Sequence, residues 1–91
     1  MGEDFSPTIG GALEALQAGH KVARKGWNGK GMYLYYVPAN SYPAVTDIAK
    51  KGFGESVPYQ AYIAMKTVQN TVVPSLASQT DLLADDWFVV E

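Results

Sequence analysis

The sequence predicts an α+β domain, in which one N-terminal helix packs on a small, twisted, mainly antiparallel sheet of about four to five strands, with a short C-terminal helical turn. Apolar residues near the N-terminus recur at helical spacing, and residues 22–37 read as two strands joined by a glycine-rich turn. Shorter apolar runs towards the C-terminus supply the remaining strands. The length of 91 residues fits a single domain over residues 1–91 with a modest core.

The N-terminal helix is predicted to begin at Ser6-Pro7, where an N-cap serine precedes proline at the first helical position. Gly19 is expected to end it, because glycine readily adopts the left-handed conformation that follows helix C-termini. His20 comes next and has no companion metal ligands, so it is interpreted as structural. The apolar face of the helix comprises the residues at i, i+3, i+4 and i+7, namely Ile9, Ala12, Leu13 and Leu16.

Phe5 lies just outside this helix and lacks its usual local partner, since the staple position inside the helix is Gly10. Two roles are open for its ring: packing on the sheet, or stacking on a ligand. Gly10 and Gly11 each weaken a helix by roughly 1 kcal/mol relative to alanine, so they either allow close packing or let the tail move.

The two strands of the hairpin, residues 22–25 and 32–37, are rich in apolar, aromatic and β-branched side chains. One helix can cover only one face of the second strand, yet both of its faces are apolar or aromatic. The other face is therefore expected to be covered by another subunit. The two alternating sets are Met32, Leu34 and Tyr36 on one side, and Tyr33, Tyr35 and Val37 on the other.

The turn of this hairpin is the candidate ligand site. Asn28-Gly29 is a strong turn signal, because both residues tolerate positive φ. Gly26, Gly29 and Gly31 let a ligand approach the backbone closely. Trp27 sits in the middle with no obvious neighbour to bury it. The turn is therefore predicted to hold a ligand through its tryptophan, its amide and its glycines.

Arg24 shares a strand face with an apolar residue, Val22, so its guanidinium needs a partner. Either an aspartate near the C-terminus neutralises it, or it binds the phosphate or carboxylate of a ligand in a bidentate manner. The sequence leaves both alternatives open.

Basic residues gather in the hairpin although the formal net charge is −2. A local basic patch on an acidic protein fits a small anionic ligand, whereas the alternative is a solvated strand edge that carries lysines against aggregation. The net charge argues against a general coat for a nucleic-acid polymer. Four of the seven basic residues lie here: Lys21, Arg24, Lys25 and Lys30.

Residues 38–58 are punctuated by prolines and glycines, and we predict an irregular loop with at most one helical turn over residues 48–51. Structureless loops of about 20 residues are uncommon and usually serve function or an interface. Tyr42 and Phe53 are candidates for contacting a neighbouring subunit. Residues 59–65 and 71–74 then read as the third and fourth strands, and residues 87–90 as a closing strand.

Thr80-Asp81 can cap a short helical turn before the closing strand, with the carboxylate near its positive end. Asp81, Asp85 and Asp86 could instead form a metal site or an acid/base pair, although caps and ion-pair partners are the favoured interpretation. The sequence holds no cysteine, no Ser–His–Asp set and no phosphate loop, so no enzyme and no cofactor are predicted. With no run of 18 apolar residues and no signal peptide, a cytoplasmic protein is expected.

The remaining parts suit a nucleotide. Trp27 can stack on a base, the local cations can meet phosphates, and Asn28 or Thr80 can meet ribose hydroxyls. Beyond composition, five blocks resemble the Thoeris anti-defence protein 2 family of phages and prophages, over nearly the whole chain. These blocks are EALQAG, KVARKGWNGKGMYLYYVP, MKT, VVP and LASQTDLLADDW.

The resemblance implies a sponge: a homo-oligomer, typically a tetramer, that sequesters glyco-cyclic ADP-ribose without cleaving it. It also implies that some members hold cyclic di- or trinucleotides in separate pockets. By matching motif, Trp27 and Asn28 would stack on and hydrogen-bond the ligand, with Arg24 nearby and Thr80 and Asp81 contributing. Because one small domain offers little concave surface, we expect pockets shared between protomers.

Two segments depart from the family pattern, residues 39–58 and the glycine-rich stretch 6–11. Two alternatives to the sponge remain open. One is a metal-dependent phosphodiesterase that uses Asp81, Asp85 and Asp86. The other is a protein-interaction module that inhibits a defence enzyme directly.

Overall fold

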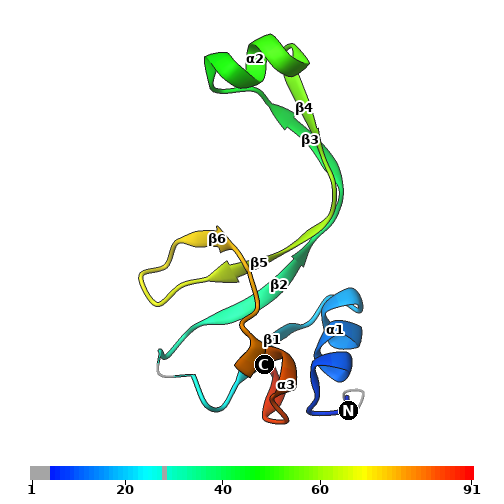
Figure 1. Ribbon diagram of the computed structural model, residues 1–91, viewed down its shortest axis with the longest axis vertical. Coiled ribbons are helices and arrows are strands. Elements are labelled where there is room, and N and C mark those ends of the chain that lie inside the picture. Colours follow the sequence, from blue (N-terminus) through cyan, green and yellow to red (C-terminus); the bar gives the residue numbers. More distant parts are fainter. Residues whose placement is uncertain (1–4, 28) are drawn as a thin grey trace.

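The computed structural model describes residues 5–27 and 29–91, and it confirms the predicted α+β class. A five-stranded antiparallel sheet has the order β6-β5-β2-β1-β7, and a separate two-stranded ribbon pairs β3 with β4 (Figure 1). The strands are β1 Lys21–Arg24, β2 Tyr33–Val37, β3 Asn40–Pro43, β4 Ser56–Tyr59, β5 Tyr62–Lys66, β6 Val72–Pro74 and β7 Trp87–Val90. The helices are α1 Ile9–Gln17, α2 Asp47–Phe53 and α3 Gln79–Leu83.

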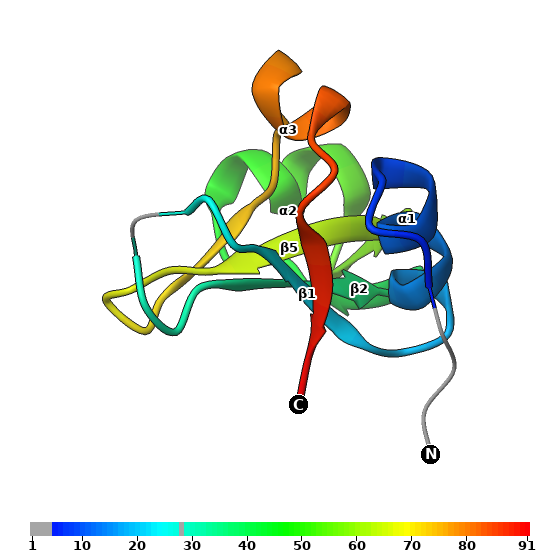
Figure 2. The ribbon, with the colours of Figure 1, turned by 90° about the horizontal axis from the view of Figure 1, so that it is seen from below.

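The predicted hairpin forms, with β1 and β2 antiparallel and Val22 opposite Leu34. On its outer side β1 pairs with β7 along its whole length, so the C-terminal strand lies against the first one (Figure 2). On the other side β2 pairs with β5, which pairs with β6. The third, fourth and closing strands are therefore confirmed, with the third beginning at Tyr62 rather than Tyr59.

The helix α1 begins later than predicted. Its N-cap is Thr8, whose hydroxyl accepts from the Gly11 N–H, so the Ser6-Pro7 start is wrong by two residues. The Pro7 carbonyl instead accepts from the Trp87 N–H, which ties this segment to β7. The predicted end is confirmed, because Gly19 follows the helix with a φ of +96°.

Gly11 explains why glycine is used inside a short helix. A Cβ at this position would overlap the backbone of Ser6, so only glycine lets the entering chain fold back over the first helical turn. This agrees with the close-packing alternative for Gly11. Gly10 is different, since a Cβ there would meet only the Thr8 hydroxyl at 3.8 Å.

The core lies between α1 and one face of the sheet. Leu13, predicted to belong to it, is 41% exposed, and Ala15 takes its place. The cluster of buried side chains consists of Ala12, Ala15, Leu16, Val22, Leu34 and Trp87. No helix packs on the opposite face of the sheet within the described residues, so the structure gives that face no cover from this chain.

The segment 38–58 is not a structureless loop, and that prediction is wrong. It forms a two-stranded arm, β3 and β4, that carries α2 at its tip and projects away from the sheet (Figure 1). Tyr42 packs edge-on against Tyr59 across the arm, with ring centroids 5.4 Å apart. Phe53 is 61% exposed and Ile48 is 85% exposed, and no residue of α2 is fully buried within its own protomer.

No helix among residues 5–27 and 29–91 combines the length and the apolar character needed to cross a membrane.

Candidate functional site

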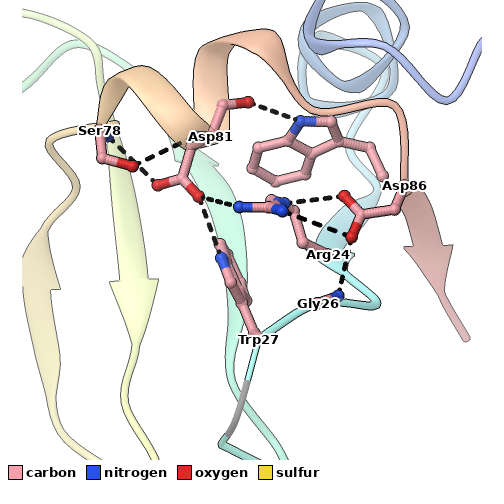
Figure 3. Close-up of polar contacts among 7 residues, drawn as sticks. Arg24, Gly26, Trp27, Ser78, Asp81 and Asp86 are labelled. Atoms are coloured by element: carbon pink, nitrogen blue, oxygen red, sulfur yellow. Dashed lines mark hydrogen bonds and ion pairs between the residues drawn. The ribbon is translucent and has the colours of Figure 1, made fainter.

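Arg24, at the end of β1, organises a cluster that joins the hairpin turn to the C-terminal segment (Figure 3). Its Nη1 donates to Asp81 Oδ1 at 2.7 Å, and its Nε donates to Asp86 Oδ1 at 2.7 Å. The guanidinium lies on the core side of the sheet, beside its cross-strand partner Trp87. Of the two alternatives for Arg24, the ion pair with C-terminal aspartates is the one that the structure contains.

Trp27 is held at the edge of this cluster. Its indole Nε1 donates to Asp81 Oδ1 at 3.2 Å, and its ring packs edge-to-face against Trp87, with centroids 5.5 Å apart and an interplanar angle of 79°. The expectation that this indole has no neighbour is therefore wrong. The ring is nevertheless only half-buried, so part of it remains exposed while its orientation is fixed.

Asp81 serves both tryptophans. Its side chain accepts from Trp27, while its backbone carbonyl accepts from Trp87 Nε1 at 3.1 Å. Its second carboxylate oxygen accepts from the Ser78 N–H at 3.2 Å, and the Ser78 hydroxyl accepts from the Asp81 N–H, which completes a capping box on α3. The cap of α3 is thus Ser78 rather than Thr80-Asp81, and Asp81 is its third helical residue.

Asp86 contacts the turn itself; the sequence indicated it as a possible ion-pair partner but did not predict this contact. Its Oδ2 accepts from the Gly26 N–H at 2.8 Å, next to its contacts with Arg24. A Cβ at Gly26 would lie 2.9 Å from Asp86 Oδ2 and 3.1 Å from Arg24 Nη2. A side chain here would therefore crowd the carboxylate that accepts from this backbone N–H. The two residues are 60 positions apart in the sequence, and the pairing of β1 with β7 brings them together.

Hydrogen bonds within the cluster shift the pKa values of its three charged side chains. Burial acts to raise the pKa of Asp81, but hydrogen bonds from Arg24, Trp27 and Ser78 outweigh it and hold that pKa below its ordinary value. The hydrogen bond from Arg24 likewise holds the pKa of Asp86 below its ordinary value, against a smaller effect of burial. The same two carboxylates raise the pKa of Arg24. All three groups therefore stay charged at neutral pH.

Acid should weaken this cluster. Because the folded-state pKa values of Asp81 and Asp86 lie below the ordinary 3.8, the stability they contribute is present above that value and lost as the pH falls through the lowered values. We expect Asp86→Asn to lower the unfolding free energy at pH 7, and its difference from the wild type to shrink towards pH 3. Urea denaturation at both pH values measures this, with exposed Asp85→Asn as the control. A difference that stays constant with pH would contradict the assignment.

The predicted site residues do not all meet. Arg24, Gly26, Trp27 and Asp81 come together in the cluster, whereas Asn28 lies outside the described residues. Gly29 in the turn lies close to the loop after β5. A Cβ at Gly29 would overlap the Val68 side chain.

Phe5 and Thr80 lie apart from these contacts. Phe5 packs on His20, with ring centroids 5.5 Å apart, and lines a cavity of about 200 Å³ between α1 and β7. Thr80 is exposed on α3, away from the hydrogen bonds of the cluster. Both remain predictions as ligand contacts.

The carboxylates of the cluster face a cation already present in the chain. Asp81 and Asp86 direct oxygens at the Arg24 guanidinium, whose positive charge disfavours a metal ion at the same position. Within residues 5–27 and 29–91, no group of three His, Cys, Asp or Glu side chains could hold a metal ion. The arrangement can orient an aromatic ring and backbone amides towards a ligand.

Comparison with known proteins identifies the family. Residues 8–90 match the model of the Tad2-like family, the Thoeris anti-defense 2-like domain. The chain is also 40% identical over 86 residues to "Thoeris anti-defense 2" from Bacillus phage SP01, an alignment that covers 91% of this chain and 93% of that protein. The chain therefore belongs to the Thoeris anti-defense 2-like family, and this membership supports a phage anti-defence role.

Proposed function

We propose that this protein is a sponge that binds glyco-cyclic ADP-ribose, the signal of Thoeris defence, and sequesters it without cleavage in the cytoplasm of the infected host. The observation that carries the proposal is the orientation of Trp27, whose half-buried indole is fixed by Asp81 and Trp87 at a basic, glycine-rich turn. A ring held in place before binding loses less conformational freedom when a base stacks on it. Family membership supports the pathway in which this binding would act.

The cations around the turn suit the pyrophosphate of such a ligand. Lys25 and Lys30 flank Trp27 in the sequence and are exposed, and neither forms an ion pair with a residue in 5–27 or 29–91. Arg24 has its charge matched by two aspartates, so in this proposal it positions the turn rather than carrying the phosphate alone. Competing at low signal concentration calls for nanomolar affinity, roughly 12 kcal/mol, which several aromatic and charge-assisted contacts together can supply.

The proposal includes a homo-oligomer, a tetramer with pockets shared between protomers, and cyclic di- or trinucleotides as a second ligand class. The arm supports the subunit contact, since Val45, Ile48 and Phe53 are largely exposed apolar side chains on or beside α2. Exposed apolar clusters of this kind mark protein interaction surfaces.

We expect Ile48→Asp combined with Phe53→Asp to reduce the mass of the oligomer by at least half, because charges would enter an apolar subunit contact. The melting temperature of the protomer core should change little, since both side chains are exposed within the protomer. Light scattering after size exclusion measures the mass. The exposed pair Lys50→Gln and Lys51→Gln on the same helix is the control. An unchanged mass in the aspartate variant would remove α2 from the contact.

Release of the captured ligand tests the function. The protein is mixed with glyco-cyclic ADP-ribose and filtered, and the retained fraction is denatured and analysed by mass spectrometry. Intact ligand released on denaturation is the expected result. Altered ligand whose formation is blocked by EDTA would instead indicate the phosphodiesterase. A filtrate with no depletion would contradict sequestration and favour the protein-interaction module.

A further inference from the structure

We propose that Ser78, an exposed and uncharged residue, is a positioning residue for the indole of Trp27 and thereby for ligand binding at the hairpin turn. It acts through Asp81, whose carboxylate lies between the two residues (Figure 3). The inference rests on the proposed function, since the ligand is the one assigned to the turn. Its structural part, the control of the indole by a helix cap, can be tested in the protein without ligand.

The two oxygens of the Asp81 carboxylate have different partners. Oδ2 accepts from the Ser78 N–H at 3.2 Å, and the Ser78 hydroxyl accepts from the Asp81 N–H at 3.1 Å. These reciprocal bonds form the capping box at the start of α3. Because Oδ2 is held in this way, the carboxylate cannot rotate freely. Oδ1 therefore faces Trp27 Nε1 at 3.2 Å and Arg24 Nη1 at 2.7 Å.

The lengths of the two bonds to Oδ1 indicate which one is lost first when the capping box opens. The bond from Arg24 joins two opposite charges and is shorter, 2.7 Å against 3.2 Å for the bond from Trp27. A carboxylate released by Ser78 would therefore turn to follow the guanidinium and leave the indole. The edge-to-face contact of Trp27 with Trp87 would remain, without the directional bond to Asp81.

Trp87 provides an internal reference for this mechanism. Its Nε1 donates to the backbone carbonyl of Asp81 at 3.1 Å, not to the carboxylate. Fraying of α3 would displace both the carbonyl and the carboxylate, whereas rotation of the carboxylate alone would release Trp27 and leave Trp87 bonded. The chain has two tryptophans, so their two indole N–H signals distinguish these cases.

The chain also offers a matched control for the loss of a helix cap. Thr46 caps α2 in the same way, since its hydroxyl accepts from the Ala49 N–H at 3.1 Å. Its helix lies at the tip of the arm, away from the hairpin turn (Figure 1). Thr46→Ala therefore removes a cap hydroxyl of the same kind without affecting Asp81. Ser78→Thr is the conservative variant, because threonine is also a favourable N-cap.

Nitrogen-15 NMR of the indole groups and calorimetric titration with glyco-cyclic ADP-ribose test the proposal. In free Ser78→Ala we expect the Trp27 Nε1–H signal, assigned from its absence in Trp27→Phe, to shift or broaden while the Trp87 signal stays in place. The affinity should fall about three- to tenfold, because the ligand must then orient the ring on binding. Ser78→Thr should restore the signal and bring the affinity to within about twofold of the wild type, and Thr46→Ala should change neither.

Several results would overturn the proposal. An unchanged Trp27 signal in free Ser78→Ala is one, even with weaker binding, since Ser78 would then contact the ligand itself. Movement of both indole signals would make Ser78 a structural cap of α3 only. A shifted Trp27 signal with wild-type affinity, or an equal loss of affinity in Thr46→Ala, would separate the cap from binding. Failure of the wild type to retain glyco-cyclic ADP-ribose would contradict the proposed function, while the signals of the free protein would still decide whether Ser78 positions the indole.

Discussion

Replacing Trp27 with alanine is expected to weaken binding of glyco-cyclic ADP-ribose by about tenfold or more while the oligomer stays intact. Stacking of a base on an aromatic side chain contributes about 1–3 kcal/mol, which corresponds to a factor of roughly 5 to 150 in affinity. The arm with α2 is separate from the turn, so subunit association should not depend on this ring. Isothermal titration calorimetry gives the affinity, and light scattering gives the mass.

Trp27→Phe is the matched control, because it keeps an aromatic ring but loses the hydrogen bond to Asp81. We expect it to retain more affinity than alanine. Both variants lose part of the contact with Trp87, so titrations should be run well below their measured melting temperatures. Affinity in the alanine variant equal to that of the wild type would remove the turn from the ligand site.

Replacing Arg24 with methionine should give the largest loss of stability outside the apolar core. The change leaves Asp81 and Asp86 facing each other without the cation that joins them. Both carboxylates also hold the turn, through Trp27 and Gly26, so their repulsion should loosen the site. We expect a fall in melting temperature of roughly 5–10 °C and weaker ligand binding at temperatures where the protein remains folded.

Lys25→Met removes one positive charge from the adjacent position, where the side chain is exposed and forms no ion pair with a described residue. It should leave the melting temperature nearly unchanged. Arg24→Lys should fall between the two, since an ammonium cannot reproduce the fork that reaches both aspartates. Equal melting temperatures for Arg24→Met and Lys25→Met would show that the cluster is not a structural link.

Elements with a strong local pattern were predictable from sequence. The helix end at Gly19 follows from glycine's freedom at positive φ, and the hairpin follows from two apolar runs around a glycine-rich turn. The start of α1 was not, because Ser6 and Thr8 are both capable caps and Gly11 decides between them by letting the chain fold back over it.

The arm was missed because its strands lack the alternation that marks a half-buried strand. All four residues of β3 are exposed, and Pro43 and Pro58 resemble loop punctuation. In a two-stranded ribbon every strand is an edge, so proline can occupy positions whose N–H would face solvent. Local pattern therefore could not separate this ribbon from a loop.

The candidate site was predictable in its residues but not in its contacts. Strand parity alone indicated that Arg24 needed a partner, and the acidic C-terminal segment supplied the candidates. The neighbour of Trp27 could not be predicted, because Asp81 lies 54 residues further along the chain and reaches the indole only through the capping box of α3. The orientation of the indole therefore depends on contacts with α3 and β7, which lie far from it in the sequence.

A crystal structure of the protein with glyco-cyclic ADP-ribose tests the central claim most directly. The account predicts an unbroken ligand with its base against the exposed part of the Trp27 ring, and with the contacts of Asp81 and Asp86 to the turn preserved. A ligand bound only away from this ring, or a cleaved product in its place, would contradict it.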